Sequence, residues 1–85
     1  MKVKVLFFAA LREQLGTSGE EIELPAGVTS VAGLRAHLMQ RGEAWQAVLA
    51  DKKLVRIAVN QEMVSPVNPI KPGDEIAFFP PVTGG

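Results

Sequence analysis

Residues 73–85, the last of the 85-residue chain, read GDEIAFFPPVTGG. Gly73 and Asp74 favour a tight turn, and the apolar run that follows predicts a strand from Glu75 to Phe79. Two prolines come next, and proline has no N–H with which to continue a sheet ladder. We therefore expect residues 1–79 to form one α+β domain and residues 80–85 to leave it as an extended tail.

The tail ends in two glycines, Gly84 and Gly85. Residues 80–85 in extended conformation reach at most about 20 Å, which is enough to enter the active site of another protein. Glycine has no side chain, so such an end passes through a narrow channel. The alternative is a frayed end without function or a cloning scar. The apolar and proline residues before the glycines argue against a scar, and we take the Gly85 carboxylate as the candidate reactive group.

At the other end of the chain, Lys2 to Phe8 predicts a strand with two different faces. Val3, Val5 and Phe7 share one face. The other face carries lysines at its start and the apolar Leu6 and Phe8 at its end, so these two are expected to be exposed or under a local cover.

Between the two ends, the sequence predicts short elements. We expect a short helix over residues 9–15, a strand over 20–24, a main helix from about residue 31 to Gly42, a second short helix over 43–49, and strands over 54–59 and 62–64. Thr29 or Ser30 is the expected N-cap of the main helix. This order indicates a β-grasp roll, with a mixed sheet of about five strands whose first and last strands are parallel neighbours.

Parallel pairing of the first and last strands would bring Phe8 close to Phe79. If Ile76 and Phe78 point into the core, alternation leaves Phe79 on the outer face, with Met63 as an expected neighbour. We therefore expect a hydrophobic binding surface at Phe8, Met63 and Phe79, with Arg12 at its polar rim. The alternative is that these rings belong to the ordinary core.

Composition excludes several classes of function. The formal net charge is zero, with nine basic and nine acidic residues, and no basic stripe suited to nucleic acid is present. The chain has no cysteine, no phosphate-binding loop and no serine–histidine–acid triad motif. The N-terminal apolar run is too short to span a membrane, so we expect a cytoplasmic protein. We expect no metal site and no tightly bound cofactor, and we interpret His37 as a packing or surface residue.

Three stretches resemble one known family: residues 6–13 (LFFAALRE), 59–61 (VNQ) and 73–85. They are similar to the small subunits of molybdopterin synthase, which are ubiquitin-like sulfur carriers. The resemblance covers almost the whole chain. It is weakest at residues 43–53, from which no role is carried over.

The resemblance implies a cycle at the C-terminus. An E1-like adenylating enzyme would use ATP and magnesium to convert Gly85 to an acyl-adenylate, and a sulfur donor would then give the thiocarboxylate. The large catalytic subunit would take in the tail, with Gly84 beside the reacting group, and sulfur would pass to cyclic pyranopterin monophosphate. Two small and two large subunits would assemble, and the small subunit would not be active alone. The expected tail contacts with partners are Pro80, Pro81, Val82 and Thr83.

Three alternatives remain open. A sulfur carrier of the thiamine pathway shares the diglycine, but residues 79–83 of this chain speak against it. A ubiquitin-like protein modifier would place Gly85 in isopeptide bonds. A purely structural interaction domain would not need the diglycine.

Overall fold

The computed structural model describes residues 1–50 and 55–80. The elements in chain order are β1 (Lys2–Phe7), α1 (Ala9–Leu15), β2 (Gly19–Glu23), α2 (Val31–Met39), α3 (Glu43–Leu49), β3 (Arg56–Val59), β4 (Glu62–Met63) and β5 (Glu75–Phe79). Their order and approximate bounds agree with those predicted from the sequence.

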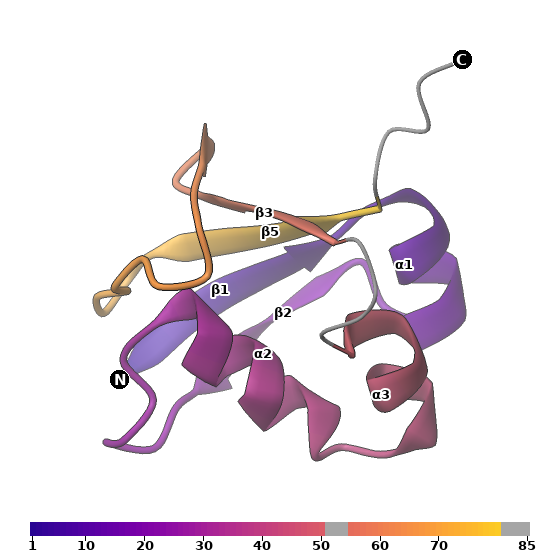
Figure 1. Ribbon diagram of the computed structural model, residues 1–85, viewed down its shortest axis with the longest axis horizontal. Helices are drawn as coiled ribbons and strands as arrows, with labels where there is room; N and C mark the ends of the chain where they lie inside the picture. The colour runs from indigo at the N-terminus through magenta and orange to yellow at the C-terminus, as the bar shows by residue number, and fades with distance from the viewer. Residues whose placement is uncertain (51–54, 81–85) are drawn as a thin grey trace.

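The strands form one mixed sheet in the order β2-β1-β5-β3-β4. β1 and β5 are parallel neighbours at its centre, and the other strand pairs are antiparallel. Helices α2 and α3 lie on one side of this sheet, and α1 lies at the end where β1 and β5 finish (Figure 1). The predicted α+β, ubiquitin-like β-grasp roll is thus confirmed.

The core lies between the sheet and α2. On β1, Val3, Val5 and Phe7 are buried, and on β5, Ile76 and Phe78 are buried on the same side. The α2 stripe that packs against them is made by Val31, Leu34 and Leu38. Because these side chains define the inner face, the remaining positions of β1 and β5 must face outward.

The free N–H groups in the first turn of α2 donate hydrogen bonds to the side chain of Ser30 and to carbonyls of the irregular segment after β4. The Gly33 N–H donates to Ser30 Oγ (3.1 Å), so Ser30 is the N-cap. The N–H groups of Val31 and Ala32 donate to the carbonyls of Asn68 (3.0 Å) and Pro66 (2.8 Å). Segment 65–70 is therefore anchored although it is neither helix nor strand.

The end of α3 is held by a buried arginine from α2. Arg35 is 9% exposed, and its Nε and Nη2 atoms donate to the carbonyl oxygens of Leu49 (2.5 Å) and Ala50 (2.8 Å). These carbonyls have no partner within α3 itself, so the guanidinium supplies what the end of the helix lacks. The local sequence pattern did not predict this contact, because Leu49 and Ala50 lie 14 and 15 residues after Arg35 in the chain.

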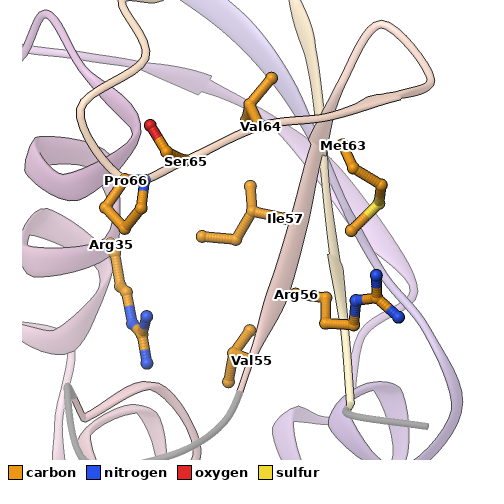
Figure 2. Close-up of a pocket in the computed structure, with 8 residues that line it drawn as sticks. All are labelled: Arg35, Val55, Arg56, Ile57, Met63, Val64, Ser65 and Pro66. Atoms are coloured by element: carbon orange, nitrogen blue, oxygen red, sulfur yellow. The ribbon is translucent and has the colours of Figure 1, made fainter.

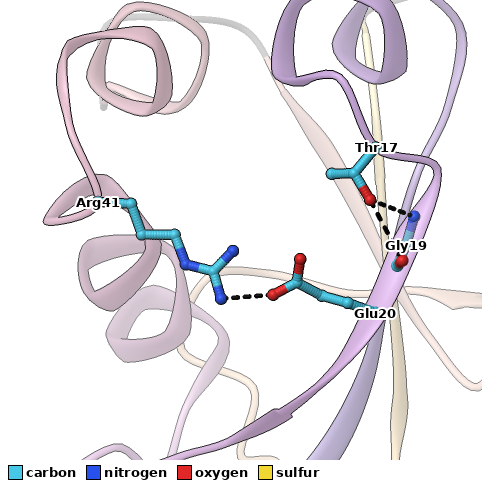
Figure 3. A network of polar contacts seen from close by, with 4 residues as sticks. All are labelled: Thr17, Gly19, Glu20 and Arg41. Atoms are coloured by element: carbon cyan, nitrogen blue, oxygen red, sulfur yellow. Dashed lines mark hydrogen bonds and ion pairs between the residues drawn. The ribbon is translucent and has the colours of Figure 1, made fainter.

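The main helix ends earlier than predicted. α2 finishes at Met39 with Gln40 as its cap, and Gly42 instead precedes α3 with φ of 145°. The N–H groups of Gln40 and Arg41 donate to the carbonyls of His37 and Leu38, which tightens the last turn. Arg41 then extends to Glu20 of β2, with an Nη2–Oε1 distance of 2.5 Å (Figure 3), and its guanidinium lies over the Trp45 ring.

The hairpin between β3 and β4 has the predicted two-residue turn. Asn60 and Gln61 have φ angles of 50° and 72°. Positive φ at both positions is typical of a type I′ turn, which suits the twist of a two-residue hairpin. β4 contains only Glu62 and Met63, one residue fewer than predicted.

Candidate functional site at the end of the central strands

The described chain leaves the sheet at the end of β5. Phe79 is the last residue of β5, and Pro80, half-buried, is the last residue before the stretch 81–85. Five of the predicted site residues therefore lie outside the described residues: Pro81, Val82, Thr83, Gly84 and Gly85. What the structure describes is the surface from which this tail departs.

Two phenylalanine rings meet at this point. The rings of Phe8 and Phe79 are stacked, with centroids 4.8 Å apart and an interplanar angle of 6°. The parallel register of β1 and β5, which places Phe7 beside Phe78, brings the next residues together, and the Phe8 N–H donates to the Phe78 carbonyl (3.2 Å). Phe8 is still 39% exposed and Phe79 is half-buried. The predicted position of this pair on the outer face is confirmed, while its role in binding stays a prediction.

Directly after Phe8 the backbone takes an unusual conformation. Ala9 has φ of 53°, in the left-handed region that residues with a Cβ rarely occupy. This conformation turns the chain from the extended Phe8 into α1. Strain at such a position persists only when the surroundings impose it, and it is often found at functional surfaces.

Strand register arranges the outer face in rows that cross the sheet. One row contains Leu6 of β1, Ala77 of β5, Ala58 of β3 and Met63 of β4. The next row, toward the end of β5, contains Phe79 opposite Arg56 of β3. We call the apolar members of these two rows, together with Phe8, the exit patch: Leu6, Phe8, Ala58, Met63, Ala77 and Phe79.

Met63 belongs to this patch at some distance from the rings. It is 52% exposed. Met63 pairs with Ala58, and Ala58 and Ala77 lie between it and Leu6 in the same row of the sheet. Alanine side chains are short, and both alanines are covered by their neighbours. The patch is therefore a shallow apolar surface with exposed side chains at its two ends.

The opposite half of the outer face is charged. Lys2 lies opposite Glu23, and Lys4 lies between Glu21 and Glu75. Opposite charges placed directly across neighbouring strands attract each other and suit a surface that stays in water. This face therefore divides into a charged half and an apolar half, and the apolar half is the candidate binding surface.

Two exposed arginines are relevant to the exit patch, one by its position in the chain and one by strand register. Arg12 is exposed on α1, four residues after Phe8, which places it about one helical turn further along. Arg56 is exposed on β3, directly opposite Phe79. Within residues 1–50 and 55–80, neither guanidinium has a hydrogen bond or an ion pair. The sequence reasoning identified Arg12 but missed Arg56, although the alternation of residues 56–59 could have placed Arg56 on the outer face.

A groove of about 410 Å³ runs along the free edge of β3 beyond β4 (Figure 2). Arg56 and Met63 extend to one side of the β3 ribbon, and Val55 and Ile57 extend to the other side. Val64, Ser65, Pro66 and the buried Arg35 complete the lining. The groove adjoins the exit patch through Arg56 and Met63.

The buried polar groups of the described chain have structural partners. Asp74, 7% exposed, accepts hydrogen bonds from Asn60 Nδ2 (3.0 Å) and from the Lys71 N–H (2.8 Å), which fixes the turn before β5. In the described ranges no cluster of three histidine, aspartate or glutamate side chains could hold a metal ion. None of the helices in these ranges is both long and apolar enough to cross a bilayer.

The chain is similar to known proteins over almost its whole length. The model of the ThiS family matches residues 5–85. The molybdopterin synthase sulfur carrier subunit of Escherichia coli strain K12 is 48% identical over 83 residues, covering 98% of this chain and 99% of that protein. The subunit of the same name from Haemophilus influenzae is 43% identical with the same coverage.

Solved structures show the same architecture. A complex of subunits 1 and 2 of molybdopterin-converting factor from Helicobacter pylori contains a chain with a TM-score of 0.70 and 31% identity, and the match covers 100% of both chains. The small archaeal modifier protein 1 of Methanosarcina acetivorans gives a TM-score of 0.74 at 26% identity, covering 99% of this chain and 96% of that one. The chain belongs to the ThiS family of ubiquitin-like β-grasp proteins, and its resemblance to the molybdopterin synthase small subunits is confirmed.

Proposed function

We propose that this chain is the sulfur carrier subunit of a molybdopterin synthase and that the Gly85 carboxylate carries the sulfur as a thiocarboxylate. The observation that supports this most is the position of the exit patch. The central strand β5 delivers the chain to the outer rim of an apolar surface, next to the stacked rings of Phe8 and Phe79. The sequence then continues to a diglycine carboxylate.

The proposed chemistry converts one group of this chain, the Gly85 carboxylate. A carboxylate is a poor electrophile, so an oxygen of Gly85 first attacks the α-phosphorus of ATP, held with magnesium by an E1-like adenylating enzyme, and pyrophosphate leaves. A sulfur nucleophile from a donor then attacks the acyl carbon, and AMP leaves with the former carboxylate oxygen. Reduction of any remaining sulfur–sulfur bond by the donor system gives the thiocarboxylate, which supplies sulfur to cyclic pyranopterin monophosphate.

A partner must cover the exit patch if it takes in the tail. Beyond Pro80 the chain has five residues, which reach at most about 18 Å when extended. A protein that binds the Gly85 carboxylate in an active site therefore has to contact the surface around Pro80. Burial of exposed aromatic side chains such as Phe8 contributes to such an interface, because aromatic residues dominate the energetics of binding surfaces.

The two subunits are proposed to supply different chemical groups. Its buried polar side chains serve the fold, so we propose that the large subunit supplies the acid and base groups and that this chain supplies a covalent co-substrate. The name of the Helicobacter pylori complex, with subunits 1 and 2 together, supports a large-subunit partner. A heterotetramer of two small and two large subunits and a cytoplasmic location remain part of the proposal.

Deletion of Gly85 tests the proposal. The deletion moves the chain end by about 3.5 Å, as far as the separation that reacting atoms require, so sulfur transfer should be abolished. Adding one residue after Gly85 should have the same effect, while both variants keep the thermal unfolding curve of the wild type. Formation of molybdopterin by the Gly85-deleted protein with the large subunit would contradict the tail mechanism.

A second candidate function is protein modification. The similarity to the small archaeal modifier protein 1 is a specific observation in its favour, since its name describes a modifier. The two functions use the same activated carboxylate and differ in the nucleophile, which is sulfur in one case and a lysine amine in the other. Mass spectrometry of tryptic digests from the native host distinguishes them, because conjugation would leave Gly85 in isopeptide bonds to lysines.

A further inference from the structure

We infer that Arg56 is a charged docking contact of the exit patch and that the large subunit presents a carboxylate side chain opposite it. The inference rests on the proposed function, because it concerns the surface by which the tail is delivered. It adds a specificity-determining residue outside the tail and outside the three apolar residues expected from the sequence.

The position of Arg56 follows from strand register. Arg56 pairs with Phe79 across β3 and β5, so the two side chains lie on the same face of the sheet. The Arg56 side chain extends to the same side of β3 as that of Met63 (Figure 2). Arg56 therefore lies between the two exposed ends of the exit patch.

Its surroundings set it apart from the other charged side chains of the outer face. Lys2 and Lys4 have glutamates directly opposite them on neighbouring strands. Arg56 lies opposite Phe79 and has no hydrogen bond or ion pair from its guanidinium within the described ranges. It is the strand residue that brings positive charge into the apolar half of this face.

Because the tail is short, we expect a partner that binds its end to contact Arg56 as well. A partner that takes in the tail contacts the surface around Pro80, and Arg56 is directly opposite the residue before Pro80. Covering an arginine without a counter-charge leaves an uncompensated charge with reduced access to water, which opposes binding. A guanidinium is matched by the planar carboxylate of aspartate or glutamate, to which it donates two parallel hydrogen bonds.

The reacting carbon of Gly85 is not the target of Arg56. In extended conformation the tail carries that carbon up to about 18 Å beyond Pro80. The expected role of Arg56 is thus to position the carrier on the large subunit. Its substitution should change the affinity for the large subunit and leave sulfur transfer at saturating large subunit unchanged.

The test compares charge reversal at Arg56 with charge reversal at a distant control. Lys71 is exposed in the segment before β5, at the opposite end of that strand from Phe79, so it serves as the distant control. Both Lys71→Glu and Arg56→Glu replace one positive side chain by a negative one and change the net charge equally. Dissociation constants for the large subunit are measured by calorimetry at low and at high salt. Arg56→Glu should raise Kd about tenfold or more at low salt and Arg56→Gln about threefold, while Lys71→Glu should change it less than about twofold.

Further readouts separate the possible outcomes. The wild-type Kd should increase with salt, and the Arg56→Gln variant should lose part of that dependence. A Kd of Arg56→Glu within twofold of the wild-type value would overturn the inference, as would an effect confined to the adenylating enzyme. If the wild-type chain itself does not bind the large subunit, the proposed function fails as well. If the wild type binds and Arg56→Glu binds equally, the proposed function stands and only the role of Arg56 is rejected.

Discussion

Phe8 and Phe79 stack face to face, with ring centroids 4.8 Å apart, although one follows the first strand and the other ends the last. The stack joins the start of α1 to the residue before Pro80. Aromatic pairs of this kind contribute about 0.5 to 1.5 kcal/mol beyond the area they bury. The point from which the tail departs is therefore tied to the central strands by a contact that is itself partly open to water.

Substitution of Phe79 should separate binding from folding. Phe78 is fully buried and packs against Phe7, with centroids 5.7 Å apart, so Phe78→Ala should lower the free energy of unfolding by about 3 to 5 kcal/mol. Phe79→Ala should lower it by only about 1 kcal/mol, the size of an aromatic pair. The same Phe79 variant should weaken binding to the large subunit about tenfold or more.

The measurements are urea denaturation of the free chain and calorimetry with the large subunit. Phe8→Ala should behave like Phe79→Ala, because both remove the same stack. A Phe79→Ala protein that loses several kcal/mol of stability and binds the large subunit normally would place Phe79 in the core and reject the interface.

Replacement of Ala9 by glycine tests the backbone conformation beside Phe8. With φ of 53°, Ala9 bears a steric cost of about 1 kcal/mol that glycine avoids, so Ala9→Gly should be neutral or stabilising. Ala36→Gly is the matched control, since Ala36 is exposed within α2 and the substitution there should cost about 0.5 to 1 kcal/mol. Equal destabilisation by the two substitutions in chemical denaturation would contradict the left-handed conformation of Ala9.

Loss of the Arg35 side chain should destabilise the contact between α2 and α3. Arg35→Ala leaves the carbonyls of Leu49 and Ala50 without their donors, and we expect unfolding to become easier by about 2 to 4 kcal/mol. Glu20→Gln serves as the control, because its ion pair with Arg41 is partly exposed and should contribute less than about 1 kcal/mol. If Arg35→Ala unfolds at the same urea concentration as Glu20→Gln, the guanidinium does not hold the end of α3.

Much of the fold was predictable because its signals are local. The alternation along β1 predicted that Val3, Val5 and Phe7 share one face, and all three are buried. For β5 the alternation left two choices, and the structure has the one in which Ile76 and Phe78 are buried. Once the first and last strands were taken as parallel neighbours, Phe8 beside Phe79 followed from the register. The proximity of the two rings could therefore be predicted from the sequence.

The remaining features depend on contacts between distant segments. The contact of Arg35 with the end of α3 joins residues that are far apart in the sequence, so no local pattern indicates it. Arg56 was missed for another reason. Its place opposite Phe79 depends on the pairing of β3 with β5, and pairing between strands is fixed only when the whole sheet forms.

The intact mass of the chain, measured after incubation with an E1-like adenylating enzyme, ATP, magnesium and a sulfur donor, tests the central claim most directly. Exchange of one carboxylate oxygen of Gly85 for sulfur should increase the mass by about 16 Da, and omission of ATP or deletion of Gly85 should prevent the increase. An unchanged mass under conditions in which the same enzymes convert the Escherichia coli sulfur carrier subunit would contradict the account.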